Sequence, residues 1–314
     1  MSDAPTSDAS VGGRLAAVLA AGEFAVTGEI VPPKGGSGAS VTAHARELVG
    51  YVDAVNVTDN PTASAHMSPA AGARFVFEAG IEPTVQLTVR DRNRLAVTSE
   101  LLGAWALGAR NLFCLTGDRV GGGDHPDAMQ VDDLSVEGLI GLVRRMRDHG
   151  TSLAGTGLVG PPRFLIGVAD APLAEPYLPE KLESKLDAGA DFVVTQIAYD
   201  LERLAGWADT MRPRGLFERA KVLIGVTPLR SAAQARFMDE KLYGVSVPAG
   251  TIAALDAAGD DAPAVGMDLT TSLVEGIRRI EGVAGIHVMA LGRDDATREL
   301  VERSGLFPRP TGAW

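Results

Sequence analysis

The stretch Asn111-Leu112-Phe113-Cys114-Leu115-Thr116-Gly117-Asp118 decides the fold class that this sequence predicts. Its first five residues are apolar or nearly so, which is typical of a strand buried on both faces of a parallel sheet. The run leads directly into Thr116, Gly117 and Asp118, and a glycine-rich loop follows. Because α/β enzymes hold their sites at the carboxyl ends of such strands, we expect the Asp118 carboxylate at a functional edge of a sheet.

Strands and helices are expected to alternate along the whole chain. Strand patterns occur at 24–31, 51–58, 83–89, 111–115, 164–168, 191–197, 221–226 and 285–291. Helical patterns occur at 11–22, 41–49, 69–80, 92–107, 134–150, 179–188, 201–211, 231–241, 249–257, 267–282 and 294–304. This alternation predicts an α/β protein with a parallel sheet, and eight units predict a single (β/α)8 TIM barrel. The additional N-terminal helix would plug or flank the bottom of the barrel.

The predicted domain organisation is simple. Residues 1–10 are small and polar and are expected to form a disordered tail. Residues 11–314 are expected to form one barrel catalytic domain, because no linker of contrasting composition divides them.

An open doubly wound sheet is the alternative fold, and it requires a glycine-rich phosphate-binding turn after the first strand. The segment there is instead Pro32-Pro33-Lys34-Gly35-Gly36. The segment Gly155-Thr156-Gly157-Leu158-Val159-Gly160 does match the dinucleotide fingerprint. However, Pro161-Pro162 and a strand follow it where the fingerprint needs a helix, so we interpret it as a loop.

Composition limits the partners and the compartment. The formal net charge of −11 argues against a nucleic-acid or anionic-membrane surface, since both need clustered cations. Cys114 is the only cysteine, which fits a reducing compartment, and it is expected to fill the core rather than to act as a nucleophile. No secretory signal is visible, so we expect a cytoplasmic protein. The histidines show no metal-ligand spacing, so no metal site is expected.

Polar side chains follow most of the predicted strands and would meet at one mouth of the barrel. They are Glu29, Thr58, Gln86, Asp118, Asp170, Gln196 and Arg293. Two carboxylates at one mouth offer an acid and base pair. The residues around Glu29 predict an apolar pocket, which would favour the protonated carboxyl of a proton donor. Spacing alone leaves open that Glu29 pairs with a barrel cation and that Asp118 caps a turn, and Thr58 and Gln196 taken singly could equally be structural.

At these positions the chain resembles the methylenetetrahydrofolate reductase family. The matching pieces, in order, are Gly28-Glu29-Ile30-Val31-Pro32-Pro33, Asn56-Val57-Thr58, Gln86-Leu87-Thr88, Leu115-Thr116-Gly117-Asp118, Lys185-Leu186-Asp187-Ala188-Gly189-Ala190, Val194-Thr195-Gln196 and Gly225-Val226-Thr227-Pro228. The resemblance runs from about Phe24 to Pro308, which is nearly the whole chain.

This resemblance implies a flavoprotein that holds FAD without a covalent bond. In the family, NADH or NADPH reduces the flavin, and the flavin then reduces 5,10-methylenetetrahydrofolate to 5-methyltetrahydrofolate in a ping-pong cycle, a step of one-carbon metabolism and methionine biosynthesis. Carried over to this chain, Glu29 is the general acid and Asp118 stabilises a cationic intermediate. Gln196 and Arg293 would bind folate. The implied cofactor contacts are Thr58, Gln86, Thr116, Gly117, Asp118, Asp170 and Lys185.

Some positions depart from the family pattern. Gln86 stands where bacterial members commonly have histidine, and Thr116 stands where they have arginine. Gln130 corresponds to a flavin-contacting tyrosine, and the aromatic residue that stacks on nicotinamide is replaced near Ala232. These departures leave two alternatives open. One is direct hydride transfer to folate from a soluble donor without FAD. The other is a folate- or flavin-binding subunit that acts with an electron-carrier or methyl-transfer partner. A homo-oligomer is also left open.

Overall fold

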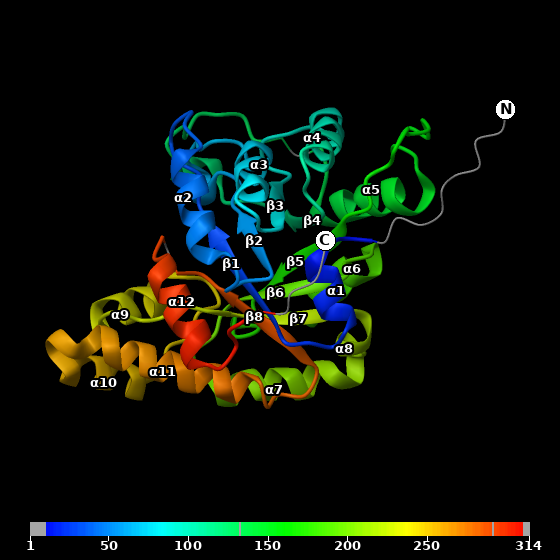
Figure 1. The fold of residues 1–314 in the computed structure, drawn as a ribbon. Coiled ribbons are helices and arrows are strands. Elements are labelled where there is room, and N and C mark those ends of the chain that lie inside the picture. Colours follow the sequence, from blue (N-terminus) through cyan, green and yellow to red (C-terminus); the bar gives the residue numbers. More distant parts are fainter. Residues whose placement is uncertain (1–10, 132, 291, 310–314) are drawn as a thin grey trace.

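The chain folds into a closed barrel of eight parallel strands (Figure 1). The computed structural model describes residues 11–131, 133–290 and 292–309. The strands are β1 (Ala25–Ile30), β2 (Ala54–Val57), β3 (Pro83–Thr88), β4 (Asn111–Leu115), β5 (Leu165–Asp170), β6 (Phe192–Ile197), β7 (Lys221–Val226) and β8 (Val283–Val288). They pair in chain order, and β8 closes the barrel against β1. The predicted (β/α)8 barrel is therefore confirmed.

Helices cover the outside of the barrel. They are α2 (Ala39–Leu48), α3 (Pro69–Glu78), α4 (Arg94–Ala106), α5 (Val136–His149), α6 (Pro179–Ala188), α7 (Leu201–Met211), α8 (Leu216–Arg219), α9 (Ala232–Lys241), α10 (Ala249–Ala258), α11 (Ala262–Ile277) and α12 (Asp294–Arg303). The bounds of α11 differ from the predicted 267–282. The helix begins earlier because Pro263 occupies its first turn, where proline is favoured. The short helix α8 was not predicted.

Alternation along the strands separates an outer apolar layer from an inner one. Outward residues such as Val55 and Val57 belong to the large core between strands and helices. Inward residues such as Ala54, Phe113 and Phe192 form a second apolar cluster inside the barrel. The same inward parity continues toward the carboxyl ends of the strands, where polar side chains replace the apolar ones.

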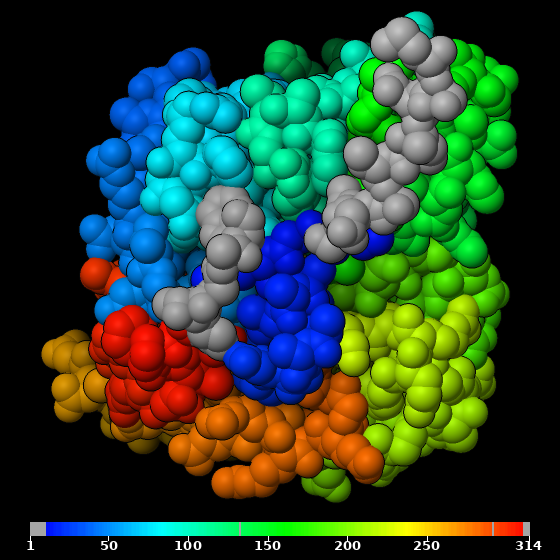
Figure 2. All heavy atoms as spheres, turned by 45° about the vertical axis from the view of Figure 1, so that its right-hand side comes forward, coloured from blue at the N-terminus to red at the C-terminus, as the bar shows by residue number. Residues whose placement is uncertain are grey.

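A short helix, α1 (Arg14–Ala20), lies before β1 and closes the bottom of the barrel. Its residues Leu15, Val18 and Leu19 join the inner apolar cluster. Figure 2 shows α1 in dark blue at the centre of this face, with the other segments arranged around it. Apolar side chains of α1 thus fill the barrel interior at this end.

The amino end of α1 is held by a buried carboxylate. Glu82, just before β3, accepts hydrogen bonds from the backbone N–H groups of Arg14 and Leu15. Asn111 Nδ2 donates to the same carboxylate over 2.6 Å. Burial raises the pKa of the Glu82 carboxyl above its ordinary value, although these hydrogen bonds oppose that effect.

The segment that resembled a dinucleotide fingerprint lies between α5 and β5. Thr151 and Gly157 form an isolated antiparallel bridge there, and the chain then enters β5 without an intervening helix. The loop interpretation is confirmed. The expected tail at 1–10 and the last residue of the predicted strand 285–291 lie outside the described residues. Within the described ranges, no helix has the length and apolar character needed to cross a membrane.

Candidate functional site

Two adjoining cavities open at the carboxyl ends of the strands. The larger cavity has a volume of about 520 Å³ and the smaller about 490 Å³. They share the lining residues Glu29, Gln86, Leu115, Thr116, Ala169, Lys185 and Tyr243. All predicted site residues except Arg293 line at least one of the two. Arg293 lines neither cavity, and its guanidinium pairs with Asp295 at 2.9 Å.

Glu29, at the end of β1, lines both cavities and is only partly exposed. Its Oε2 accepts a hydrogen bond from Gln86 Nε2 over 3.2 Å and lies 3.9 Å from His287 Nε2. The predicted apolar pocket is therefore wrong. Strand alternation turns the apolar neighbour Ile30 toward the outer core, so the carboxylate faces an amide and an imidazole instead. Within the described part of the chain, no lysine or arginine of the barrel forms an ion pair with Glu29.

His287 was missed by the sequence reasoning. It lies on β8, directly beside Thr27 of β1 in the strand register, and its side chain is 2% exposed. His287 Nδ1 and Thr27 Oγ1 lie 2.8 Å apart. When the Thr27 hydroxyl donates to Nδ1, Nε2 carries the imidazole proton and faces Glu29. The sequence did contain a signal for this position. Every second residue of the predicted last strand faces the same side, and in the series Gly285, His287 and Met289 the histidine is the polar residue.

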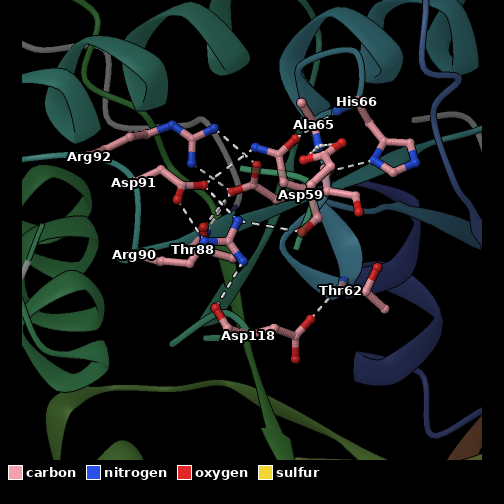
Figure 3. Close-up of polar contacts among 12 residues, drawn as sticks. Asp59, Thr62, Ala65, His66, Thr88, Arg90, Asp91, Arg92 and Asp118 are labelled. Carbon is pink, nitrogen blue, oxygen red and sulfur yellow. Dashed lines mark hydrogen bonds and ion pairs between the residues drawn. The ribbon is translucent and has the colours of Figure 1, made fainter. Parts of the chain in front are cut away.

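Asp118 holds a neighbouring loop (Figure 3). Its Oδ2 accepts a hydrogen bond from the backbone N–H of Thr62 over 2.8 Å, and its carbonyl oxygen accepts one from Arg90 Nη1. Thr62 and its neighbour Ala63 both have a φ of 54°, which is strained for residues with a Cβ. Asp118 thus caps the loop after β2, as one of the two interpretations of the sequence proposed. It also lines the smaller cavity.

The same corner contains a buried ion pair that the sequence did not reveal. Asp59 accepts two hydrogen bonds from the Arg92 guanidinium, at 2.7 and 3.0 Å, and two from Thr88. Arg90 forms a second fork with Asp91, and that hydrogen bond lowers the pKa of the Asp91 carboxyl. These pairs fix the ends of β2 and β3 beside the smaller cavity.

Gly117 is a glycine because its surroundings leave no room for a side chain. Its φ is 88°, and a Cβ there would lie 3.1 Å from both Arg90 Cβ and Thr88 Cβ. Thr116 beside it is exposed and lines both cavities. The turn after β4 therefore brings Thr116, Gly117 and Asp118 to the cavity wall together, as the sequence predicted.

Asp170 and Lys185 form the opposite wall of the larger cavity. Asp170 Oδ2 accepts a hydrogen bond from the Tyr177 hydroxyl over 3.0 Å, and Lys185 Nζ donates to the Ala169 carbonyl over 2.7 Å. Burial raises the pKa of the Asp170 carboxyl and lowers that of the Lys185 ammonium. Both shifts have the same main cause, which is the burial of the two groups in this wall. Tyr177 was not predicted as a site residue.

Thr58 and Gln196 complete the predicted set. The Thr58 hydroxyl is buried beside the smaller cavity and has no hydrogen-bond partner in the described part of the chain. Gln196 Nε2 donates to the Tyr243 carbonyl over 3.3 Å. Tyr243 lines both cavities and is 70% exposed, so its ring stands at the shared opening. Its place in a loop without a strand pattern explains why the sequence did not identify it.

Cys114 behaves as core, as predicted. Its side chain is 1% exposed, and burial raises the pKa of the thiol, which leaves it protonated and unreactive. Among the residues that the structure describes, no group of three or more His, Cys, Asp and Glu side chains is placed to hold a metal ion.

The amino-acid sequence of the chain is similar to those of known proteins over most of its length. A family model described as methylenetetrahydrofolate reductase matches residues 14–305. Methylenetetrahydrofolate reductase 2 of Saccharomyces cerevisiae is 24% identical over 256 residues, which cover 77% of this chain and 40% of that protein. The 5,10-methylenetetrahydrofolate reductase of Escherichia coli is 26% identical over 233 residues, covering 73% of this chain and 72% of that protein. The chain therefore spans less than half of the yeast relative and most of the bacterial one.

The fold also occurs in solved structures. One of them is that of an uncharacterized protein from Clostridium thermocellum that binds two copies of 5-methyl-5,6,7,8-tetrahydrofolic acid. The TM-score is 0.60 with 13% sequence identity, and the match covers 93% of this chain and 100% of that one. At this identity the likeness concerns the fold alone.

Proposed function

Because the chain belongs to the methylenetetrahydrofolate reductase family, we propose that it reduces 5,10-methylenetetrahydrofolate to 5-methyltetrahydrofolate. The observation that carries the proposal is the placement of Glu29. Its carboxylate lines both cavities and is oriented by the Gln86 amide, in a space large enough for a folate ring.

Glu29 is proposed to act as the general acid. In the substrate, one methylene carbon bridges N5 and N10, and the product carries a methyl group on N5. The bond between this carbon and N10 must therefore break, and N10 must receive a proton. Glu29 donates that proton as the bond breaks, which leaves a cationic iminium at N5. A hydride then adds to the methylene carbon and completes the methyl group.

Asp118 is proposed to stabilise the positive charge that develops on the substrate. One of its carboxylate oxygens is engaged by the backbone of Thr62, which fixes the direction of the group. A fixed negative group in the cavity wall is well suited to stabilise a cation, since it needs no reorganisation during the reaction.

FAD is the proposed hydride source, and the cavity walls offer groups that fit it. The unpartnered Thr58 hydroxyl and the Asp170 carboxyl suit the hydroxyl groups of a ribityl chain. Gln86, Thr116, Gly117, Asp118 and Lys185 line the same two cavities and are the remaining proposed contacts. With FAD bound, the reduced flavin ring supplies the hydride after NADH or NADPH has reduced it.

Direct hydride transfer from a soluble donor is the second candidate, and one observation favours it. Among the described residues that line the two cavities, the lysine and arginine side chains are Lys181 and Lys185 alone. Lys185 is tied to a carbonyl and has a lowered pKa. A resident dinucleotide needs its diphosphate held by cations or helix amides, whereas a donor that leaves after each turnover needs less anchoring.

An absorption spectrum of the purified protein tests these alternatives. We expect a flavin band that NADH or NADPH bleaches under anaerobic conditions and that methylenetetrahydrofolate restores. A colourless protein that FAD cannot reconstitute, yet that converts methylenetetrahydrofolate with NADH, would establish direct transfer. A band that neither nucleotide bleaches would indicate an electron-carrier partner. Absence of any methyltetrahydrofolate with all these donors would overturn the proposed function.

A further inference from the structure

The floor of the larger cavity contains a buried amide without a partner. Asn56 lies on β2, its residue is 2% exposed, and its Nδ2 has no hydrogen-bond partner within the described ranges. It lines the larger cavity together with Glu29 and Gln86. A buried polar group without a partner destabilises the fold, so its presence calls for an explanation.

Neighbouring groups do not supply the missing partner. Glu29 Oε2 accepts from Gln86 Nε2, and Gln196 Oε1 accepts from the backbone N–H of Ile197. The Thr27 hydroxyl is engaged with His287. Packing does not require an amide at this position either, because the preceding inward residue of β2, Ala54, belongs to the inner apolar cluster. Asn56 thus lines a cavity, and its amide nitrogen has no partner among the described residues.

A second buried side chain without a partner, Thr84, lies beside Asn56 but differs from it in its position relative to the cavities. Thr84 is the register neighbour of Asn56 on β3, and its hydroxyl is also buried without a partner. Thr84 is 0% exposed and lines neither of the two cavities, whereas Asn56 does line one. Of these two unpartnered side chains, only Asn56 therefore belongs to the wall of a cavity that a ligand can occupy.

We propose that Asn56 Nδ2 donates a hydrogen bond to the C4 carbonyl oxygen of the folate pteridine ring. This inference rests on the proposed function and adds a recognition residue to it. Glu29 and Asn56 are paired in the strand register, and neighbouring strands lie about 4.8 Å apart. In a pteridine, the C4 oxygen lies on the same edge of the ring as N5. A ligand whose N5–CH2–N10 bridge faces Glu29 has this oxygen toward one of the two strands beside β1, and the β2 side carries the unpartnered amide of Asn56.

The chemistry of the amide suits this role. An acceptor that is part of the ring system distinguishes the pteridine from the aminobenzoyl and glutamate parts of the ligand. A buried unpaired donor also discriminates strongly, because a ligand without the matching acceptor leaves it unsatisfied. Asn56 would accordingly select for the pteridine end of folate and orient it relative to Glu29.

Equilibrium binding to three probes tests the inference. The probes are 5-methyltetrahydrofolate, 6-methyltetrahydropterin, which lacks the tail, and p-aminobenzoylglutamate, which lacks the pteridine. The variants are Asn56→Leu, which is nearly isosteric, and Asn56→Ala, which avoids overpacking. We expect both to weaken the two pteridine ligands about tenfold and to leave p-aminobenzoylglutamate unchanged. Thr84→Val is the matched control and should bind all three probes as wild type does.

Thermal unfolding gives an independent readout. Since the amide is unpaired without ligand, Asn56→Leu should melt at the same temperature as wild type or higher, while its stabilisation by 5-methyltetrahydrofolate shrinks. Unchanged pteridine binding by both Asn56 variants overturns the inference and leaves the proposed function standing. Equal weakening of all three probes also overturns it, because it indicates general distortion. A wild-type protein that binds neither pteridine ligand overturns the inference and counts against the proposed function as well.

Discussion

Gln86 Nε2 donates a hydrogen bond to Glu29 Oε2 over 3.2 Å. The resemblance to the family assigned Gln86 to the cofactor, yet in this chain the amide holds the proposed general acid. Because β2 separates β1 from β3, the contact crosses a strand that contributes Asn56 to the same layer. Glu29 is therefore oriented by a side chain two strands away. Substitution of Gln86 can consequently remove this orientation while the Glu29 carboxyl group remains in place.

Glu29→Gln should remove the acid while keeping the shape of the side chain. We expect the rate of folate reduction to fall about 10²–10⁴-fold, which is the usual contribution of a general acid. Oxidation of the hydride donor by an artificial acceptor should stay within a factor of two, because that step needs no proton from Glu29. Rapid-mixing kinetics of the two half-reactions measures both. Equal loss in both half-reactions refutes the acid role, and Glu23→Gln, at the exposed start of the same segment, is the control.

Gln86→Leu should keep the volume of the side chain and remove its donor. A hydrogen bond of this kind typically contributes about 0.5–1.5 kcal/mol, so we expect kcat to fall about two- to tenfold. Gln86→Glu should instead place a second carboxylate beside Glu29, which disfavours the ionised pair and moves the pH–rate profile to higher pH. Steady-state kinetics across a pH series distinguishes the two. An unchanged profile for Gln86→Glu would mean that the contact is absent during turnover.

His287→Phe tests whether the imidazole positions Glu29. The substitution keeps a ring in the barrel and removes Nε2, which lies 3.9 Å from the carboxylate. We expect kcat to decrease several-fold with little change in the KM for folate, since the imidazole orients the acid rather than the substrate. His287→Gln restores an amide donor and should recover part of the rate. Failure of His287→Gln to exceed His287→Phe would assign His287 to packing.

Asp118→Asn and Asp118→Ala separate charge from capping. An asparagine oxygen can still accept the Thr62 N–H, so Asp118→Asn should keep the loop in place and lower folate turnover about ten- to hundredfold through lost charge stabilisation. Asp118→Ala should lose both functions and also expose the loop to limited proteolysis. If Asp118→Asn turns over normally and only Asp118→Ala is impaired, the residue is a cap and nothing more.

The (β/α)8 barrel could be predicted from local patterns in the sequence. Apolar runs such as 111–115 are set by burial on both faces, and glycines or prolines at their ends mark the turns. The convergence of Glu29, Asp118 and Gln196 followed from one topological rule, because parallel strands end on the same side. No knowledge of tertiary contacts was needed for either step.

Other parts of the site depend on contacts that the local sequence does not encode. Thr27 and His287 meet only because β8 closes against β1, across a separation of 260 positions. The strained loop at Thr62 is held by a carboxylate from another loop, and its residues carry no signal for a positive φ. The apolar environment predicted for Glu29 failed for a related reason. Its sequence neighbours point outward, and its spatial neighbours come from β3 and β8.

Glu82→Gln should change how stability depends on pH. Burial raises the pKa of the Glu82 carboxyl, so the folded state binds its proton more tightly than the unfolded state, whose ordinary value is 4.5. The stability that this group contributes is fully present below about pH 4.5 and is lost as the pH rises through the folded pKa. Glutamine mimics the protonated form and does not titrate, so the variant should gain stability relative to wild type as the pH increases.

Urea unfolding at several values between pH 4.5 and pH 8 measures this difference in the free energy of unfolding. Glu78→Gln, on the exposed face of α3, is the matched control and should show a difference that varies little with pH. If the stability of Glu82→Gln falls relative to wild type as the pH rises, the ionised carboxylate stabilises the fold. The hydrogen bonds from Arg14, Leu15 and Asn111 would then outweigh the effect of burial at the base of the barrel.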